Sequence, residues 1–209
     1  EVKVDFSEDG HGSAVLLIHS TVAGNKQWRK LIEYLSPHYQ VIAPNLFGYG
    51  SSPQWSKKRD QTLSDHVDLL KGFFERNESI SIVGHSFGGS VAMMAAKEYP
   101  EKIEKLVLIE PNPFYLLKNH SDPGSYQEVL NIRDIIKANA FKETWGQAAK
   151  QFADYWNGSG AWTKMDEFRR EKFAEALKPN FHEFDCVINE TTSLEEWRDV
   201  LPLNTHILL

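Results

Sequence analysis

A serine lies between glycines where an expected strand meets an expected helix, in the segment Gly84-His85-Ser86-Phe87-Gly88-Gly89. Residues 79–83 alternate polar and apolar side chains, as a short strand does, and residues 90–97 are rich in strong helix formers. A turn this tight has no room for side chains beside the serine, which accounts for the flanking glycines. We therefore predict that the Ser86 hydroxyl is exposed at the edge of a sheet, on a strained turn.

A serine in this position could attack a carbonyl group. Its hydroxyl is a weak nucleophile and needs a base to accept the proton. The negative oxygen formed in the attack needs N–H donors aimed at it. A glycine-rich turn with an incidental serine is the alternative interpretation. The position between strand and helix favours the nucleophile.

The surrounding elements indicate an α/β fold. Residues 14–18 form a continuous apolar run, as expected for a strand that is covered on both faces. Strands that alternate with helices imply a parallel sheet. The strands are expected at residues 2–6, 14–18, 39–43, 79–83 and 105–109, with a turn at 7–10. The helices are expected at residues 28–35, after a capping box at 62–65, and at 90–97.

The alternation stops at residue 110, and the following residues predict helices alone. Apolar strand character returns only at residues 205–209, which resemble the start of a buried strand. We therefore assign residues 1–110 to the core, 111–199 to an inserted helical cap and 200–209 to the returning core strand. The cap helices are best indicated near residues 125–139, 141–156 and 166–178, with a second capping box at Ser193–Glu196.

Three motifs resemble those of the α/β-hydrolase superfamily, in its cap-bearing serine hydrolase branch. They are Leu16-Leu17-Ile18-His19-Ser20-Thr21, Pro44-Asn45-Leu46-Phe47-Gly48-Tyr49-Gly50-Ser51 and the serine turn, in the family's order and spacing. The resemblance implies a mostly parallel central sheet flanked by helices, with an inserted helical cap. It also implies that the serine turn is the nucleophile elbow and that Ser86 is the nucleophile.

The resemblance further implies two oxyanion donors: the backbone N–H of Phe87 in the elbow, and a second N–H in the loop after the early strand. The family's His-Gly-x pattern maps onto His19-Ser20-Thr21, so the Thr21 N–H is the expected donor and His19 is expected to order the loop. Ser20 stands where the family has glycine, and Val22 is therefore the alternative donor. No catalytic role is expected for the other histidines, which are His11, His38, His66, His85, His120, His182 and His206.

The catalytic acid and histidine of this family follow the serine in the chain. The acid normally follows the strand after the cap, and the histidine follows the last strand. The sequence ends at Leu209, so we expect a C-terminally truncated chain, both partners beyond Leu209 and an inactive 209-residue form. Glu110 is the alternative acid within the chain because it ends the strand after the elbow helix. Capping that strand end is its simpler interpretation.

The composition argues against several classes of protein. The net charge is −6 without a basic run, which argues against nucleic-acid binding. Cys186 is the single cysteine, so an internal disulfide and a multi-cysteine metal site are excluded. No apolar run approaches about 18 residues and no signal peptide is visible, so we expect no membrane span and a cytoplasmic location. Without a His-x-x-x-His spacing, no metal or cofactor is expected.

The resemblance implies a hydrolase that cleaves an ester, thioester or related acyl bond of a small apolar substrate. Dehalogenases and epoxide hydrolases of this architecture use aspartate as nucleophile, and Ser86 argues against both. A carbon–carbon bond hydrolase, a cofactor-free haloperoxidase and a non-catalytic ligand- or partner-binding protein remain alternatives. Aromatic residues of the cap could line a pocket above Ser86, namely Phe114, Trp145, Tyr155, Trp156 and Trp162, with Phe47 and Phe87 reaching the same space.

Overall fold

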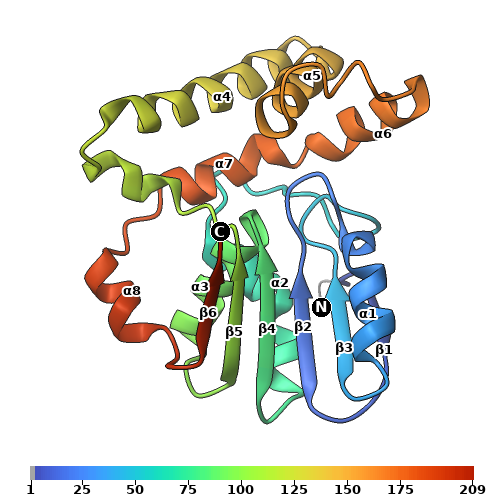
Figure 1. Ribbon diagram of the computed structural model, residues 1–209, viewed down its shortest axis with the longest axis vertical. Coiled ribbons are helices and arrows are strands. Elements are labelled where there is room, and N and C mark those ends of the chain that lie inside the picture. Colours follow the sequence, from blue (N-terminus) through green and yellow to red (C-terminus); the bar gives the residue numbers. More distant parts are fainter. Residues whose placement is uncertain (1–2) are drawn as a thin grey trace.

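A six-stranded sheet forms the centre of the computed structural model, which describes residues 3–209 (Figure 1). The strands are β1 (Phe6–Asp9), β2 (Ala14–Ile18), β3 (Gln40–Pro44), β4 (Ile80–His85), β5 (Ile103–Ile109) and β6 (Thr205–Leu208). Their spatial order is β1-β3-β2-β4-β5-β6. β1 runs antiparallel to β3, and the other neighbouring pairs are parallel. The expected α/β architecture is confirmed.

Helices pack on both faces of the sheet. They are η1 (Asn25–Trp28), α1 (Arg29–Leu35), α2 (Leu63–Glu75) and α3 (Phe87–Glu98). Leu16 and Ile18 of β2 belong to the large core that includes α2 and α3, whereas Val15 and Leu17 belong to a smaller core with Trp28. Side chains alternate between the faces of a strand, so both faces of β2 are covered. This burial explains the continuous apolar run at residues 14–18.

Two helices begin at the capping boxes that the sequence predicts. The Thr62 side chain accepts a hydrogen bond from the Asp65 N–H, and the Asp65 carboxylate accepts one from the Thr62 N–H. Ser193 and Glu196 make the same pair of bonds at the start of α8 (Leu194–Val200). These reciprocal bonds satisfy N–H groups that have no partner within a helix.

A helical lobe lies across the carboxyl ends of the strands (Figure 1). It consists of η2 (Phe114–Asn119), α4 (Pro123–Phe141), α5 (Trp145–Asn157), α6 (Glu167–Leu177) and α7 (Asn180–Ile188), of which α7 is nearest to the sheet. α8 packs against α3 beside the sheet, with Trp197 buried. None of the helices in residues 3–209 is both long enough and apolar enough to cross a bilayer.

The first strand differs from the expectation. It covers Phe6–Asp9, so it replaces most of the expected turn at 7–10, and the expected strand at 2–6 is correct at Phe6 and wrong at residues 3–5. Val2 lies outside the described residues. All four strand residues are exposed, and the strand is held by its backbone pairing with β3. An exposed edge strand has no buried face, so it lacks the hydrophobic alternation that would reveal it.

The other differences lie near the lobe and at the last strand. The sequence did not mark η2 or α7 as separate helices, although it indicated helices in general over this stretch. β6 is not buried as expected. It is an edge strand in this structure, and its Ile207 and Leu208 side chains are 55% and 53% exposed.

The close approach of α3 to β2 can be tested at Gly88. A Cβ there would clash with the main-chain oxygens of Ile18 and His19, and relieving the clash would require a backbone shift. We expect Gly88→Ala to lower the free energy of unfolding by about 3 kcal/mol. Gly72→Ala is the matched control, because a Cβ at Gly72 on α2 meets nothing within 4 Å.

Gly72→Ala should raise the free energy of unfolding by roughly 0.5–1 kcal/mol, since alanine loses less entropy than glycine in a helix. Urea unfolding followed by circular dichroism measures both variants. Equal effects of the two substitutions would contradict the packing described here.

Candidate active site

Ser86 occupies a sharp turn between β4 and α3. Its φ and ψ angles are 52° and −117°, a conformation that side-chain-bearing residues rarely adopt. The Ser86 N–H donates to the Ile109 carbonyl oxygen of β5 at 2.9 Å, and the Gly89 N–H donates to the Ser86 carbonyl oxygen at 2.8 Å. The turn is therefore tied to both the sheet and the helix. Backbone strain of this kind costs about 1–3 kcal/mol and is concentrated at functional sites.

Within residues 20–23 of the loop after β2, one N–H group near this turn has no acceptor among the described residues. The Ser20 N–H donates to Gln27 Oε1 at 3.1 Å, and the Ala23 N–H donates to the Ser20 carbonyl oxygen. The Val22 N–H donates to Tyr49 Oη at 3.0 Å. Among residues 3–209, the Thr21 N–H has no acceptor. Val22, the alternative oxyanion donor, is thus already engaged, which corrects that part of the expectation.

The Phe87 N–H has no acceptor among the described residues either. Phe87 is the first residue of α3, where N–H groups have no partner within the helix. The amino end of a helix also carries partial positive charge. Thr21 and Phe87 stay predicted oxyanion donors, and their free N–H groups are compatible with that role.

His19 orders the loop, as the resemblance implies. Its buried ring accepts a hydrogen bond at Nε2 from the Leu46 N–H at 3.0 Å and donates from Nδ1 to the Ser20 carbonyl oxygen at 2.8 Å. Burial lowers the pKa of His19 to about 4, so the ring is neutral at pH 7. The ring also packs edge-to-face against Tyr49. His19 therefore joins the loop after β2 to the loop after β3.

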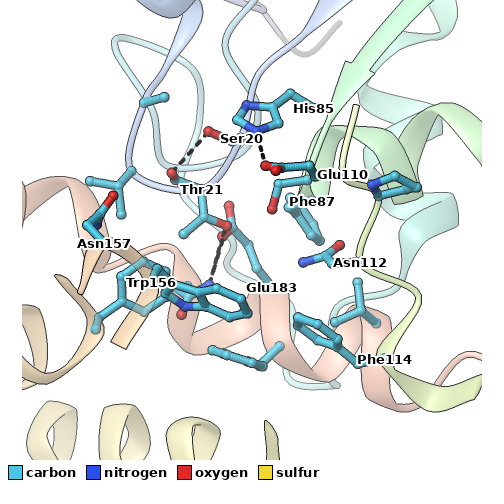
Figure 2. Close-up of a pocket in the computed structure, with 18 of the residues that line it drawn as sticks. Ser20, Thr21, His85, Phe87, Glu110, Asn112, Phe114, Trp156, Asn157 and Glu183 are labelled. Atoms are coloured by element: carbon cyan, nitrogen blue, oxygen red, sulfur yellow. Dashed lines mark hydrogen bonds and ion pairs between the residues drawn. The ribbon is translucent and has the colours of Figure 1, made fainter. Parts of the chain in front are cut away.

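His85 belongs to a chain of side chains on the other side of the loop. Gln27 Oε1 accepts from Ser20 Oγ at 2.9 Å, and Gln27 Nε2 donates to His85 Nδ1 at 3.0 Å. His85 Nε2 faces Glu110 Oε2 at 3.6 Å (Figure 2). Both ring nitrogens of His85 are thus directed at neighbours other than Ser86. In this arrangement His85 and Glu110 do not form the acid–base pair of a triad.

A cavity of about 740 Å³ lies between the serine turn and the helical lobe. Ser86 contributes a polar group to its wall. Thr21, Asn112 and Glu183 also contribute polar groups (Figure 2). The aromatic wall consists of Phe87, Phe114, Phe152, Trp156, Phe173 and Phe184.

Four of the aromatic residues expected here do not line this cavity, namely Phe47, Trp145, Tyr155 and Trp162. The last three pack against the hydrophobic core. Phe47 lines a separate, smaller pocket.

Glu183 of α7 is the polar residue that sequence reasoning missed. Its side chain is 1% exposed and accepts hydrogen bonds from Thr21 Oγ1, Tyr49 Oη and Asn180 Nδ2 at 2.6, 2.9 and 3.0 Å. Burial raises its pKa, although these bonds act in the opposite direction. In the sequence, Glu183 lies one helical turn before Val187 on an apolar helix face, and this position was the available signal that Glu183 could be buried.

Among residues 3–209, no three His, Cys, Asp or Glu side chains converge to hold a metal ion.

His66 lies beneath the elbow. Its ring packs edge-to-face against Phe87 and Phe47, with centroid distances of 5.0 and 5.3 Å. Neither ring nitrogen has a hydrogen-bond partner among the described residues. Burial lowers the pKa of His66 to about 3, so folding requires the neutral ring. His66 is therefore a buried residue of the hydrophobic core, and no catalytic role was expected for it.

His66 and His19 should make the protein sensitive to acid. Their pKa values of about 3 and 4 in the folded state lie below the ordinary histidine pKa of about 6.5. Between about pH 6.5 and these folded-state values, the unfolded chain therefore binds more protons than the folded chain. The free energy of unfolding should therefore fall as the pH drops from about 6.5 toward 4, by a few kcal/mol. Urea unfolding at pH 7, 5.5 and 4 measures this slope.

The variant His66→Leu should reduce that slope and keep the stability at pH 7 within about 1 kcal/mol, because leucine needs no partner in an apolar site. His38→Leu, at an exposed position, is the matched control for the loss of a histidine. An unchanged slope in His66→Leu would contradict the assignment to His66.

Similarity to known proteins agrees with this geometry. A family model described as the alpha/beta hydrolase fold matches residues 13–159. The 2-hydroxy-6-oxo-2,4-heptadienoate hydrolase of Pseudomonas putida is 29% identical over 224 residues, covering 100% of this chain and 80% of that protein. The cis-3-alkyl-4-alkyloxetan-2-one decarboxylase of Shewanella oneidensis is 30% identical over 118 residues, covering 54% of this chain and 37% of that protein.

The chain spans about half or less of the length of several curated relatives that it matches. Among solved structures, the esterase EaEST from Exiguobacterium antarcticum superposes with a TM-score of 0.72 at 16% identity, covering 99% of this chain and 76% of that one. At this identity the likeness concerns the fold alone. The family model covers well over half of the 209 residues. The chain therefore belongs to the α/β-hydrolase fold family.

Proposed function

We propose that this protein is a serine hydrolase that cleaves an ester, thioester or related acyl bond of a small, largely apolar substrate. The observation that carries the proposal is the placement of Ser86. It lies on a strained turn at the wall of an aromatic-lined cavity, and the Phe87 and Thr21 N–H groups nearby have no acceptor among residues 3–209. A site with a nucleophile and free donors suits acyl transfer.

The reaction follows from these groups. Ser86 Oγ attacks the carbonyl carbon while a histidine base accepts its proton. The Phe87 and Thr21 N–H groups donate to the negative oxygen of the tetrahedral intermediate. The intermediate collapses, and the leaving alcohol or thiol takes the proton from the histidine. Water then attacks the acyl-enzyme with the same histidine as base, which releases the acid and restores Ser86.

The histidine and its acid partner are proposed to come from outside residues 3–209. Ser86 Oγ has no hydrogen-bond partner among these residues, and both nitrogens of His85 face other groups. Glu110 is directed at His85 and so is not available to orient a different histidine in this arrangement. We therefore expect the 209-residue chain to be inactive or nearly so.

The helical lobe of η2 and α4–α7 is proposed to act as the cap over this site. It contributes Phe114, Phe152, Trp156, Phe173 and Phe184 to the cavity wall, which suits an apolar acyl group.

Relatives named as hydrolases and lipases support the general reaction class. A non-catalytic binding protein of this fold is the alternative. The backbone strain at Ser86 favours catalysis, because binding alone does not require it.

Labelling with a fluorophosphonate tests the proposal. A chain extended beyond Leu209 should be labelled at Ser86, and Ser86→Ala should abolish the labelling. Ser79→Ala, at an exposed serine, should leave it unchanged. The 209-residue chain should react at least about a thousandfold more slowly than the extended chain, because no base activates the Ser86 hydroxyl. Mass spectrometry of the labelled peptide identifies the serine.

Two results would count against the proposal. A folded, extended chain that stays unlabelled at Ser86 would exclude the serine hydrolase. Rapid labelling of Ser86 in the 209-residue chain would show that the base lies within it.

A further inference from the structure

Glu183 connects the helical lobe to the loop after β2. It lies on α7, whereas its partner Thr21 is 162 positions away in the sequence. Figure 2 shows the Glu183 side chain next to Thr21, at the wall of the cavity. Its two carboxylate oxygens accept three hydrogen bonds. Oε1 accepts from Tyr49 Oη, and Oε2 accepts from Thr21 Oγ1 and Asn180 Nδ2.

These bonds are needed because the carboxylate is buried. Among residues 3–209, no Lys, Arg or His forms an ion pair with Glu183. A buried charge without a counter-ion is costly unless hydrogen bonds replace its lost water. The hydroxyl groups of Thr21 and Tyr49 are two of its three donors. The position of α7 is thereby coupled to the positions of both hydroxyl groups.

The Tyr49 hydroxyl group also bonds to a loop residue in an unfavourable conformation. Val22 has a φ of 72°, a left-handed value that is costly for a β-branched residue. Its N–H donates to the Tyr49 hydroxyl, which in turn donates to Glu183. Glu183 thus restrains Thr21 directly and Val22 through Tyr49. Of the loop residues 20–22, the Gln27 side chain bonds only to Ser20.

We propose that Glu183 is a positioning residue that holds the Thr21 N–H in place from the helical lobe, so that the oxyanion site is complete only while α7 is seated on the core. The inference rests on the proposed function for the role of Thr21. Direct binding of substrate by Glu183 is disfavoured, because both oxygens are engaged and the side chain is 1% exposed.

Hydrogen exchange of the 209-residue chain tests the restraint without any activity. In Glu183→Ala and Glu183→Gln, the amides of residues 19–24 should exchange faster than in the unchanged chain, by about tenfold in the alanine variant. Amides of β4 and β5 should keep their rates. The matched control is Glu171→Gln, at an exposed position of α6 in the same lobe. Unchanged exchange at residues 19–24 in folded Glu183 variants would overturn the proposal.

Kinetics of an extended, active chain test the consequence for catalysis. Glu183→Gln should lower kcat by about ten- to a hundredfold, with KM within about twofold, because the oxyanion forms only in the transition state. Thr21→Val removes the same contact without altering α7 and keeps the Thr21 backbone N–H. The two substitutions together should cost less than the product of their separate effects, since they break one shared bond.

A rise in KM at unchanged kcat would overturn the proposal in favour of substrate binding by Glu183. Independent, multiplicative effects of the two substitutions would overturn it as well. If Ser86 is not labelled in any variant, the unchanged sequence included, the proposed function fails. The exchange rates would then still decide whether Glu183 holds the loop.

Discussion

The close contact of main chains around Ser86 is the constraint on which the site depends. α3 begins against the ends of β2 and β4, where a Cβ at Gly84 would clash with the Gly88 carbonyl and a Cβ at Gly88 with the Ile18 and His19 carbonyls. Two glycines allow this approach. Since the Ser86 N–H is bonded to β5, the serine is held at a positive φ with the amino end of α3 beside it. Backbone packing thus places both a hydroxyl and a free N–H at the cavity.

Hydrogen-bond satisfaction then determines the second half of the site. Buried N–H groups almost always have partners, and the loop after β2 follows that rule at Ser20, Val22 and Ala23. The Thr21 N–H is left over among the described residues. The side chains that satisfy its neighbours come from separate segments, Gln27 in the core and Tyr49 with Glu183 across the lobe boundary. A polar network of this kind is sensitive to the loss of any member.

Local signals were sufficient for much of the fold. The capping boxes at Thr62 and Ser193, the buried run at residues 14–18 and the elbow all depend on neighbours within a few positions. β1 was expected a few residues too early because pairing with β3, and not burial, holds it. The hydrogen-bond partners of Glu183 could not be foreseen for a related reason. The apolar face of α7 indicates that Glu183 could be buried, but its partners Thr21 and Tyr49 lie 162 and 134 positions away in the sequence.

The sequence by itself determined the fold family, the parallel sheet and the place of Ser86, because glycine spacing, hydrophobic periodicity and helix caps act over short distances. Tertiary structure alone decided which N–H of residues 20–23 stays free, which aromatic side chains line the cavity, and where His85 and Glu110 point. These outcomes depend on groups brought together from distant segments. No local pattern records whether a donor such as the Val22 N–H will meet a hydroxyl such as that of Tyr49.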